Sequence, residues 1–183
     1  RKLLLFSWFG KKKHVKTEKE PPKVYTALEV ARHIINYANS NDQLLSNLKL
    51  QKLLYFVQAK FLISQGRICF TDDIEAWDFG PVVSSVFREF KIFGSFHIPP
   101  VKHYYVEDES QPFNFRRVVF YDIEITNEDK AVIDEVVDYF ADYSSVALTD
   151  LTLKQFPWKN AYSDSCRNVI TAESIRNYFS SRE

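Results

Sequence analysis

The fold depends most on one long helix, which we predict from residues 46–62, SNLKLQKLLYFVQAKFL. Its apolar residues recur at the i, i+3, i+4, i+7 and i+11 positions that one face of an α-helix brings together. They are Leu50, Leu53, Leu54, Val57 and Phe61. Phe56 and Leu62 lie off this stripe, which indicates a central helix that is buried on most sides. Gly66 is a natural stop for this helix.

Side chains with polar tips form a second stripe beside the leucines. Gln51, Tyr55 and Gln58 lie at i, i+4 and i+7 of the same helix. One interpretation is a boundary stripe that forms hydrogen bonds inside the domain. The other is a rim that faces a partner, because tyrosine combines an apolar body with a polar edge and is common at interfaces. On that second interpretation the three residues, together with Arg88, are candidates for partner binding.

Capping signals predict the helices on either side of the central one. Thr26 and Glu29 form a capping box, in which the hydroxyl and the carboxylate satisfy each other's backbone amides. The helix that begins there is expected to end at residues 40–42. Because proline is pre-organised for the first position of a helix, we expect Pro81 to begin a third helix and Gly94 to end it.

The second half of the chain combines a hairpin with further helices. Residues 97–125 contain two β-rich runs separated by a polar stretch, which predicts a hairpin with a long loop. Helices are expected to begin near Thr126 and near residues 144 and 171, and the second of these must end before Pro157. The predicted fold class is α+β, mainly α, as a compact bundle of about five to six helices with one small antiparallel β-hairpin.

Charge and glycine content narrow the possible functions. The chain has 183 residues with 24 basic and 24 acidic side chains, so net charge gives no indication of an obligatory nucleic-acid partner. It contains four glycines, and no two of them are closer than fourteen positions. Gly-x-Gly-x-x-Gly fingerprints and Walker loops need clustered glycines to bring backbone amides against phosphate. The sequence therefore argues against the common nucleotide-driven enzymes.

Residues with catalytic or metal-binding potential are scattered. The four histidines lack metal-ligand spacing, and no Gly-x-Ser-x-Gly elbow marks a serine nucleophile. The acidic group at residues 72–78 could hold a divalent cation, although a solvated turn is the favoured interpretation. We therefore expect a protein that is not an enzyme, with no catalytic residue, metal or cofactor. Cys69 and Cys166 lie far apart, which fits a reducing compartment such as the cytoplasm.

The first residues differ from the rest of the chain. Residues 1–23 carry eight basic and two acidic side chains, a net charge of +6, around a short apolar run that includes Trp8 and Phe9. Seven apolar residues are too few to span a bilayer. We expect residues 1–24 to be a basic tail with a proline linker, either flexible or anchoring Trp8 and Phe9 in a partner groove or at a membrane surface. Residues 25–183 are expected to form one domain.

Three blocks of the sequence resemble a known family. They are residues 50–59, residues 74–90 and, more weakly, residues 148–161. The specific part is Glu-Ala-Trp-x-x-Gly-Pro-Val at residues 75–82. In order and separation these blocks are similar to the Panacea domain, the SocA-like antitoxin family that is often phage-associated, and the resemblance covers roughly residues 26–182. At Thr152-Leu153 this chain departs from the Thr-His pair expected of the family.

The resemblance implies an antitoxin of a toxin–antitoxin system with a role in phage defence. Such a protein neutralises a cognate protein toxin by direct binding, so a hetero-oligomer is expected. One alternative is a proteolytic adaptor that delivers the toxin to a AAA+ protease, because one family member acts in that way. A further alternative is an enzyme that modifies the toxin, although the missing histidine argues against a shared catalytic site.

The resemblance also implies a set of frame residues that maintain the fold. We expect Glu75 and Lys52 to pair, Gly80 to permit a tight approach before Pro81, and Trp77 to lock that turn against the second helix. Partner choice would then depend on the hairpin, the tail and exposed aromatic residues. The complete frame is Lys52, Tyr55, Gln58, Glu75, Trp77, Gly80, Pro81 and Trp158.

Overall fold

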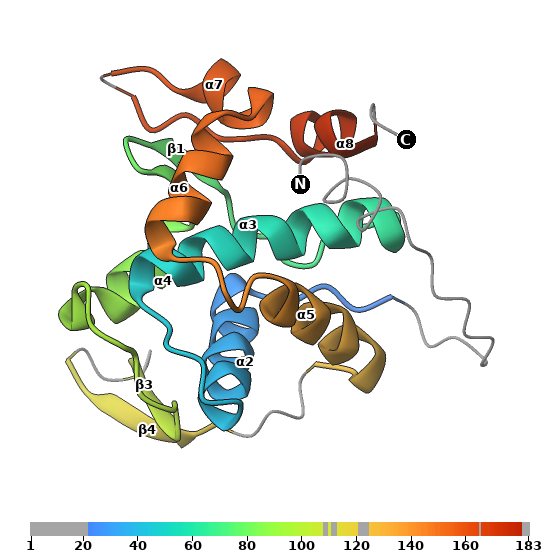
Figure 1. Cartoon of the computed structure of the whole chain (residues 1–183). Coiled ribbons are helices and arrows are strands. Elements are labelled where there is room, and N and C mark those ends of the chain that lie inside the picture. Colours follow the sequence, from blue (N-terminus) through green and yellow to red (C-terminus); the bar gives the residue numbers. More distant parts are fainter. Residues whose placement is uncertain (1–21, 108–109, 111–112, 121–124, 165, 181–183) are drawn as a thin grey trace.

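The computed structural model describes residues 22–183 apart from 108–109, 111–112, 121–124, 165 and 181–183 (Figure 1). The predicted tail, with Trp8 and Phe9, therefore lies outside the described residues. The described part contains seven α-helices and two antiparallel two-stranded sheets, so the predicted mainly α class is confirmed. The helices are α2 (Ala27–Ser40), α3 (Asn47–Ser64), α4 (Ser84–Phe90), α5 (Asn127–Tyr139), α6 (Ser145–Leu153), α7 (Phe156–Ala161) and α8 (Ala172–Ser180). The strands are β1 (Glu75–Trp77), β2 (Gly80–Val82), β3 (His103–Glu107) and β4 (Phe115–Val119).

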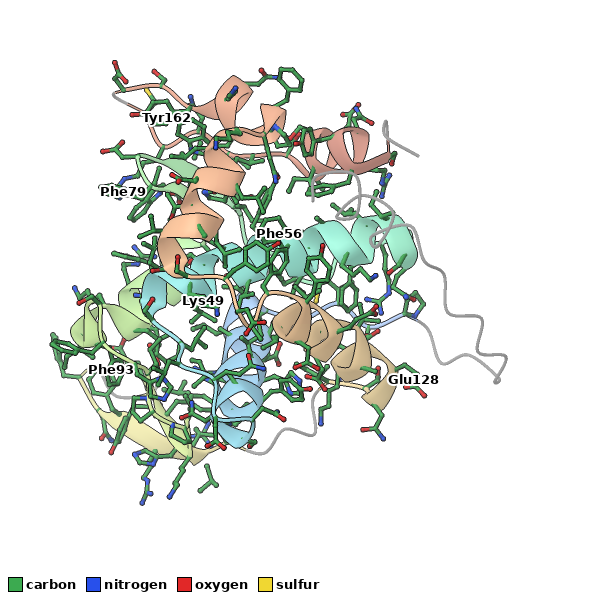
Figure 2. All side chains as sticks on the ribbon, in the orientation of Figure 1. Lys49, Phe56, Phe79, Phe93, Glu128 and Tyr162 are labelled. Carbon is green, nitrogen blue, oxygen red and sulfur yellow. The ribbon has the colours of Figure 1, made fainter. Side chains whose placement is uncertain are left out.

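The helix α3 lies at the centre of the molecule, as predicted. It runs between α2 and α5 on one side and α6 and α8 on the other, and it contacts all four (Figure 1). Almost every residue from Asn47 to Leu62 is buried. Phe56, which is labelled in Figure 2, lies on α3. Its ring stacks on that of Phe140, which follows α5, with the ring centroids 4.4 Å apart. The central helix thus contributes side chains to the core on all of its sides. This explains why its apolar residues are not confined to one face.

Hydroxyl caps fix where the predicted helices begin. Thr26 and Glu29 make both hydrogen bonds of a capping box at the start of α2. Ser46, Thr126 and Ser144 cap α3, α5 and α6 by accepting a hydrogen bond from the backbone amide three residues later. These starting points agree with the sequence prediction.

The segment around Pro81 differs from the prediction. Pro81 lies inside β2, which pairs with β1 in a tight antiparallel hairpin, and α4 begins only at Ser84. Gly80 has a φ of +98°, which turns the chain back toward β1 where the prediction placed the start of a helix. Proline is tolerated here because a two-stranded ribbon has edges on which no amide needs to donate. Gly94 does follow the short 3₁₀ turn (Lys91–Phe93) that extends α4.

One helix was missed by the sequence prediction. The prediction ended the fifth helix before Pro157, and α6 does end at Leu153. The chain then re-enters a helix at once, as α7, with Pro157 in its first turn. Proline lacks the backbone N–H, but the N–H groups in the first turn of a helix have no partner within the helix. Proline is therefore unfavourable inside a helix and favourable at its start.

The predicted hairpin is confirmed as β3 and β4, which pair antiparallel from His103–Val119 to Glu107–Phe115. In Figure 1 this ribbon lies at the edge of the molecule, beyond α2 and α4. Residues 121–124 of the second β-rich run lie outside the described residues. Among the helices that the structure describes, none is both long and apolar enough to cross a membrane.

Candidate functional site

The polar stripe of α3 lies inside the domain. The exposed fractions of Gln51, Tyr55 and Gln58 are 1%, 0% and 5%. These side chains offer no surface to a partner, so their interpretation as a partner-facing rim was wrong. Each makes hydrogen bonds within the fold, which is the other interpretation of the stripe. Arg88, by contrast, is exposed on α4 and stays a candidate for partner binding.

The two glutamines bind backbone groups of other segments of the chain. Gln58 accepts hydrogen bonds from the amides of Cys69 and Phe70 and donates one to the carbonyl of Phe70. Gln51 accepts a hydrogen bond at 2.9 Å from the amide of Val83, directly before α4. Tyr55 donates a hydrogen bond at 2.7 Å to Gln155, and burial raises the pKa of Tyr55 well above its usual value. The stripe therefore connects α3 to three distant parts of the chain.

Lys52 is the most unusual residue of the frame. Its side chain is fully buried, and its Nζ donates a hydrogen bond at 3.0 Å to the carbonyl oxygen of Pro81. Burial lowers the pKa of Lys52 from 10.5 to about 7, because the charged form loses its hydration. The predicted pair with Glu75 does not form, since the carboxylate of Glu75 instead accepts a hydrogen bond at 2.6 Å from the indole of Trp77.

Gly80 lies directly against Lys52 and Thr152 of α6. A Cβ atom at Gly80 would lie 2.7 Å from Thr152 Oγ1 and 3.0 Å from both Cε and Nζ of Lys52. Real Cβ atoms essentially never approach other heavy atoms as closely as 2.7 Å. The glycine is therefore required twice, once for its positive φ and once for this contact between β2, α3 and α6. We refer to Lys52, Gly80, Pro81 and Thr152 as the corner.

Trp77 fixes the outer side of the same hairpin. Its ring lies edge-on to Phe87 of α4 at a centroid distance of 5.1 Å, and the guanidinium of Arg167 lies 4.1 Å from its centroid. Its carbonyl accepts a hydrogen bond from the indole of Trp158 at 2.8 Å. The turn is thus held against α3 by Lys52 and Gly80, rather than by Trp77 as we predicted. Phe79 projects from the tip of the hairpin into solvent (Figure 2).

The polar side chains of the corner form hydrogen bonds with backbone groups of the domain. The one hydrogen bond that Lys52 makes with the described residues is to a backbone carbonyl. Thr152 donates its hydroxyl proton to the carbonyl of Thr149 at 2.9 Å. One hollow on the described surface is lined by α2 and the base of the β3–β4 hairpin, and another by the segments before α3 and α6. Neither is lined by a residue of the corner. Within the described ranges no three or more His, Cys, Asp and Glu side chains gather closely enough to hold a metal ion.

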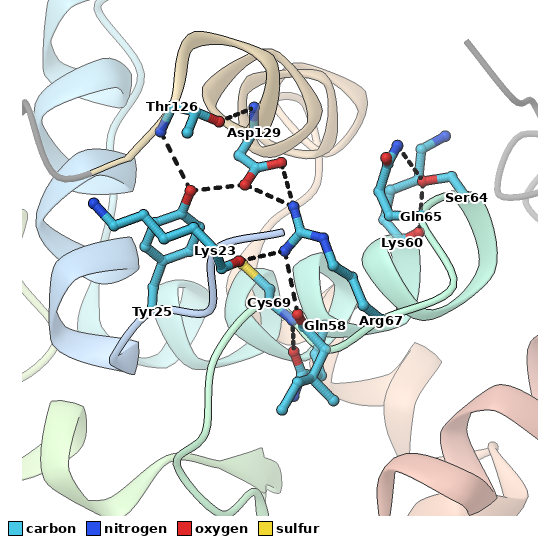
Figure 3. A network of polar contacts seen from close by, with 11 residues as sticks. Lys23, Tyr25, Gln58, Lys60, Ser64, Gln65, Arg67, Cys69, Thr126 and Asp129 are labelled. Atoms are coloured by element: carbon cyan, nitrogen blue, oxygen red, sulfur yellow. Dashed lines mark hydrogen bonds and ion pairs between the residues drawn. The ribbon is translucent and has the colours of Figure 1, made fainter. Parts of the chain in front are cut away.

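A second polar cluster, missed by the sequence analysis, joins the start of the described chain to α5 (Figure 3). Arg67 donates to both carboxylate oxygens of Asp129 at 2.6 and 2.7 Å, and Tyr25 donates to the same carboxylate at 2.7 Å. Arg67 also donates to the carbonyl of Lys23. Burial, and secondarily the bond to Asp129, raises the pKa of Tyr25 to about 12. No sequence spacing signals this cluster, because its members come from three separate segments.

Comparison with known proteins agrees with the motifs found in the sequence. The family described as "Antitoxin SocA-like, Panacea domain" matches residues 50–159, which run from α3 into α7 and make up more than half of the chain. A curated protein of Caulobacter vibrioides (strain NA1000 / CB15N), named "Antitoxin SocA", is 40% identical over 79 residues. Those residues are 43% of this chain and 42% of that protein, so the match spans less than half of the relative's length. No solved structure matches the chain. From the family match, this chain belongs to the SocA-like antitoxin family with a Panacea domain.

Proposed function

We propose that this protein is an antitoxin that neutralises a cognate protein toxin by binding it directly in a hetero-oligomeric complex. The observation that carries the proposal is the family match over residues 50–159, which contains most of α3, the corner and both hairpins. The relative named as an antitoxin supports it further. We place the antitoxin domain at residues 25–183 and regard residues 1–24 as a separate tail that could add a second contact.

The positions of the motif residues favour binding over chemistry. Lys52, Tyr55, Gln58 and Gly80 are buried, and the hydrogen bonds of the three side chains go to groups within the domain. Side chains used in this way stiffen the helices and hairpins around them. A stiff, pre-organised surface loses less conformational entropy when it binds, so the buried motif supports affinity without touching the partner.

Co-expression tests the proposal. The probe is the protein encoded by the reading frame next to this gene, expressed from an inducible promoter in a host that lacks both genes. Alone it should arrest growth, and together with this protein growth should recover. The two proteins should also co-purify as a complex that survives gel filtration. Continued arrest despite abundant folded antitoxin would refute the proposed function.

The same cells separate direct neutralisation from the two alternative mechanisms. Direct binding predicts that the half-life and the intact mass of the toxin stay the same when this protein is present. Delivery to a AAA+ protease predicts a shorter half-life of the toxin. Modification by an enzyme predicts a changed mass that persists after the two proteins are separated. Recovery of growth with either of these changes would overturn the mechanism of simple binding.

A further inference from the structure

The β3–β4 hairpin has one face turned toward the helices and one turned away. Side chains alternate between the two faces of a strand. Tyr104 marks the inner face, because the guanidinium of Arg32 on α2 lies 3.7 Å from its ring centroid. The cross-strand pairs on the opposite face define what we call the ribbon face: His103, Tyr105, Glu107, Phe115, Arg117 and Val119.

The ribbon face exposes large apolar side chains. Tyr105 is 61% exposed, Phe115 is 59% exposed and Val119 is 48% exposed. Phe113, at the end of the loop before β4, is 89% exposed. Single exposed apolar residues are common, but several on one short ribbon form a patch of the kind that marks an interaction site.

The two arginines of the hairpin strands both lie on β4. Arg116 and Arg117 are both exposed, and neither forms an ion pair with a residue that the structure describes. Arg117 instead lies 3.3 Å from Nδ1 of His103. Glu107 is the one carboxylate of the two strands, and it is paired in register with Phe115. Arg117 belongs to the ribbon face, whereas Arg116 is paired in register with Val106 on the other face, so β4 carries one exposed guanidinium on each side. An acidic segment laid along the β4 edge could reach both of them.

The outer edges of the two strands could also pair with an extended segment of another protein. Within the described residues β3 and β4 pair only with each other, so each keeps one edge of amides and carbonyls without a strand partner. An extended segment of another protein can add to such an edge, with backbone hydrogen bonds giving affinity and side-chain contacts giving specificity. A second copy of this chain would suit the β4 edge poorly, because antiparallel pairing of two β4 strands would bring arginines beside arginines.

We propose that the ribbon face, together with Arg116, is the surface that captures the toxin, and that the toxin contributes an extended segment with acidic side chains flanked by apolar ones. This inference rests on the proposed antitoxin function and gives it a location. The acidic groups pair with Arg116 and Arg117, and the apolar ones cover Tyr105, Phe115 and Val119. The buried motif then provides the frame, and the hairpin provides the contact.

The test reverses the two charges and compares a matched variant. The double variant Arg116→Glu/Arg117→Glu changes the net charge by the same amount as Lys159→Glu/Arg176→Glu, whose residues are exposed on α7 and α8. The probe is the purified product of the adjacent reading frame, in an inactivated form for titration and an active form for growth rescue. We expect the first variant to bind at least about tenfold more weakly and to lose rescue, and the α7–α8 variant to bind like the wild type.

Two further measurements keep the inference testable if the charge reversal disturbs the hairpin. Tyr105→Ser/Phe115→Ser should weaken binding without a change of charge. Arg116→Ala/Arg117→Ala should bind with a shallower dependence on salt than the wild type. Wild-type affinity and rescue in all hairpin variants would overturn the inference and leave the proposed function intact. Failure of the wild type to bind or rescue would overturn both. A homodimer that the hairpin variants abolish would identify a second copy as the occupant instead.

Discussion

The ammonium of Lys52 donates a hydrogen bond to the carbonyl oxygen of Pro81 at 3.0 Å, from a side chain that is completely buried. Within the described residues the structure gives it no carboxylate partner. The pKa of Lys52 falls to about 7 as a result of this burial. One hydrogen bond to a carbonyl compensates only part of the hydration that the ammonium loses on burial. The contribution of Lys52 to the free energy of unfolding should therefore depend on pH.

Replacement of Lys52 by methionine should therefore change stability in a manner that depends on pH. Between pH 7 and 10.5 the unfolded chain keeps the proton on Lys52 and the folded chain does not, so wild-type stability rises with pH. The rise across this window is up to about 5 kcal/mol. Lys52→Met lacks this contribution, so its stability relative to the wild type should be greatest near pH 6 and should decline toward pH 10.

Urea unfolding at a series of pH values checks this expectation. The exposed Lys91→Met is the matched control and should differ from the wild type by less than about 0.5 kcal/mol at each pH. A difference between Lys52→Met and the wild type that stays constant from pH 6 to pH 10 would show that the buried amine keeps an ordinary pKa.

Gly80→Ala should be strongly destabilising, and Gly66→Ala only mildly. Both glycines have a positive φ, +98° and +70°, so both alanines carry a backbone cost of about 1–2 kcal/mol. A Cβ at Gly66 meets nothing within 4 Å, whereas one at Gly80 meets Thr152 and Lys52. The clash should add about 1–3 kcal/mol at Gly80. Thermal unfolding of the two variants measures the difference, and equal losses would mean that the corner has room for a methyl group.

Thr149→Val and Thr152→Val should change stability in opposite directions. The hydroxyl of Thr149 is buried and has no hydrogen-bond partner in the described part of the chain. Valine removes this unsatisfied group at nearly constant volume, so Thr149→Val should stabilise by about 1 kcal/mol. The hydroxyl of Thr152 donates to the carbonyl of Thr149, so Thr152→Val should cost about 1 kcal/mol. Chemical denaturation distinguishes the two, and loss of stability in both would indicate that Thr149 has a partner.

The helices could be predicted from the sequence because their signals are local. Thr26, Ser46, Thr126 and Ser144 cap helices at the expected positions, and the apolar period of α3 identifies the central helix. Pro81 could not be assigned in this way. Proline suits both the first turn of a helix and the edge of a strand, and the choice depends on the positive φ of Gly80 and on contacts with α3 and α6.

The candidate site could be predicted only in part. The motif residues Lys52, Gly80 and Pro81 do meet, but the role of the α3 glutamines depends on residues far along the chain. Gln51 binds the amide of Val83, 32 positions away. A polar residue on a helix that is apolar on all sides is compatible with either a buried hydrogen bond or a surface rim, and burial becomes known only from the tertiary structure.

Asp129→Asn should destabilise the domain by about 3 kcal/mol, because it removes the charge that pairs with Arg67 in a largely buried position. Asp138→Asn, on the same helix, is the matched control. Asp138 is exposed and accepts a hydrogen bond from Tyr37 at 2.8 Å, so its loss should cost less than about 1 kcal/mol. Urea denaturation compares them. Similar small losses would show that the cluster in Figure 3 adds little to stability.

Lys52→Met should still neutralise the toxin. A buried amine with a pKa of about 7 is also what a catalytic lysine would have, so this residue is the sharpest test of whether the protein acts by binding alone. If the frame only supports a binding surface, a folded Lys52→Met variant should bind the product of the adjacent reading frame with an unchanged Kd and should restore growth fully. A variant that folds and binds normally but fails to restore growth would assign a chemical role to Lys52. That result would replace the binding mechanism with an enzymatic one.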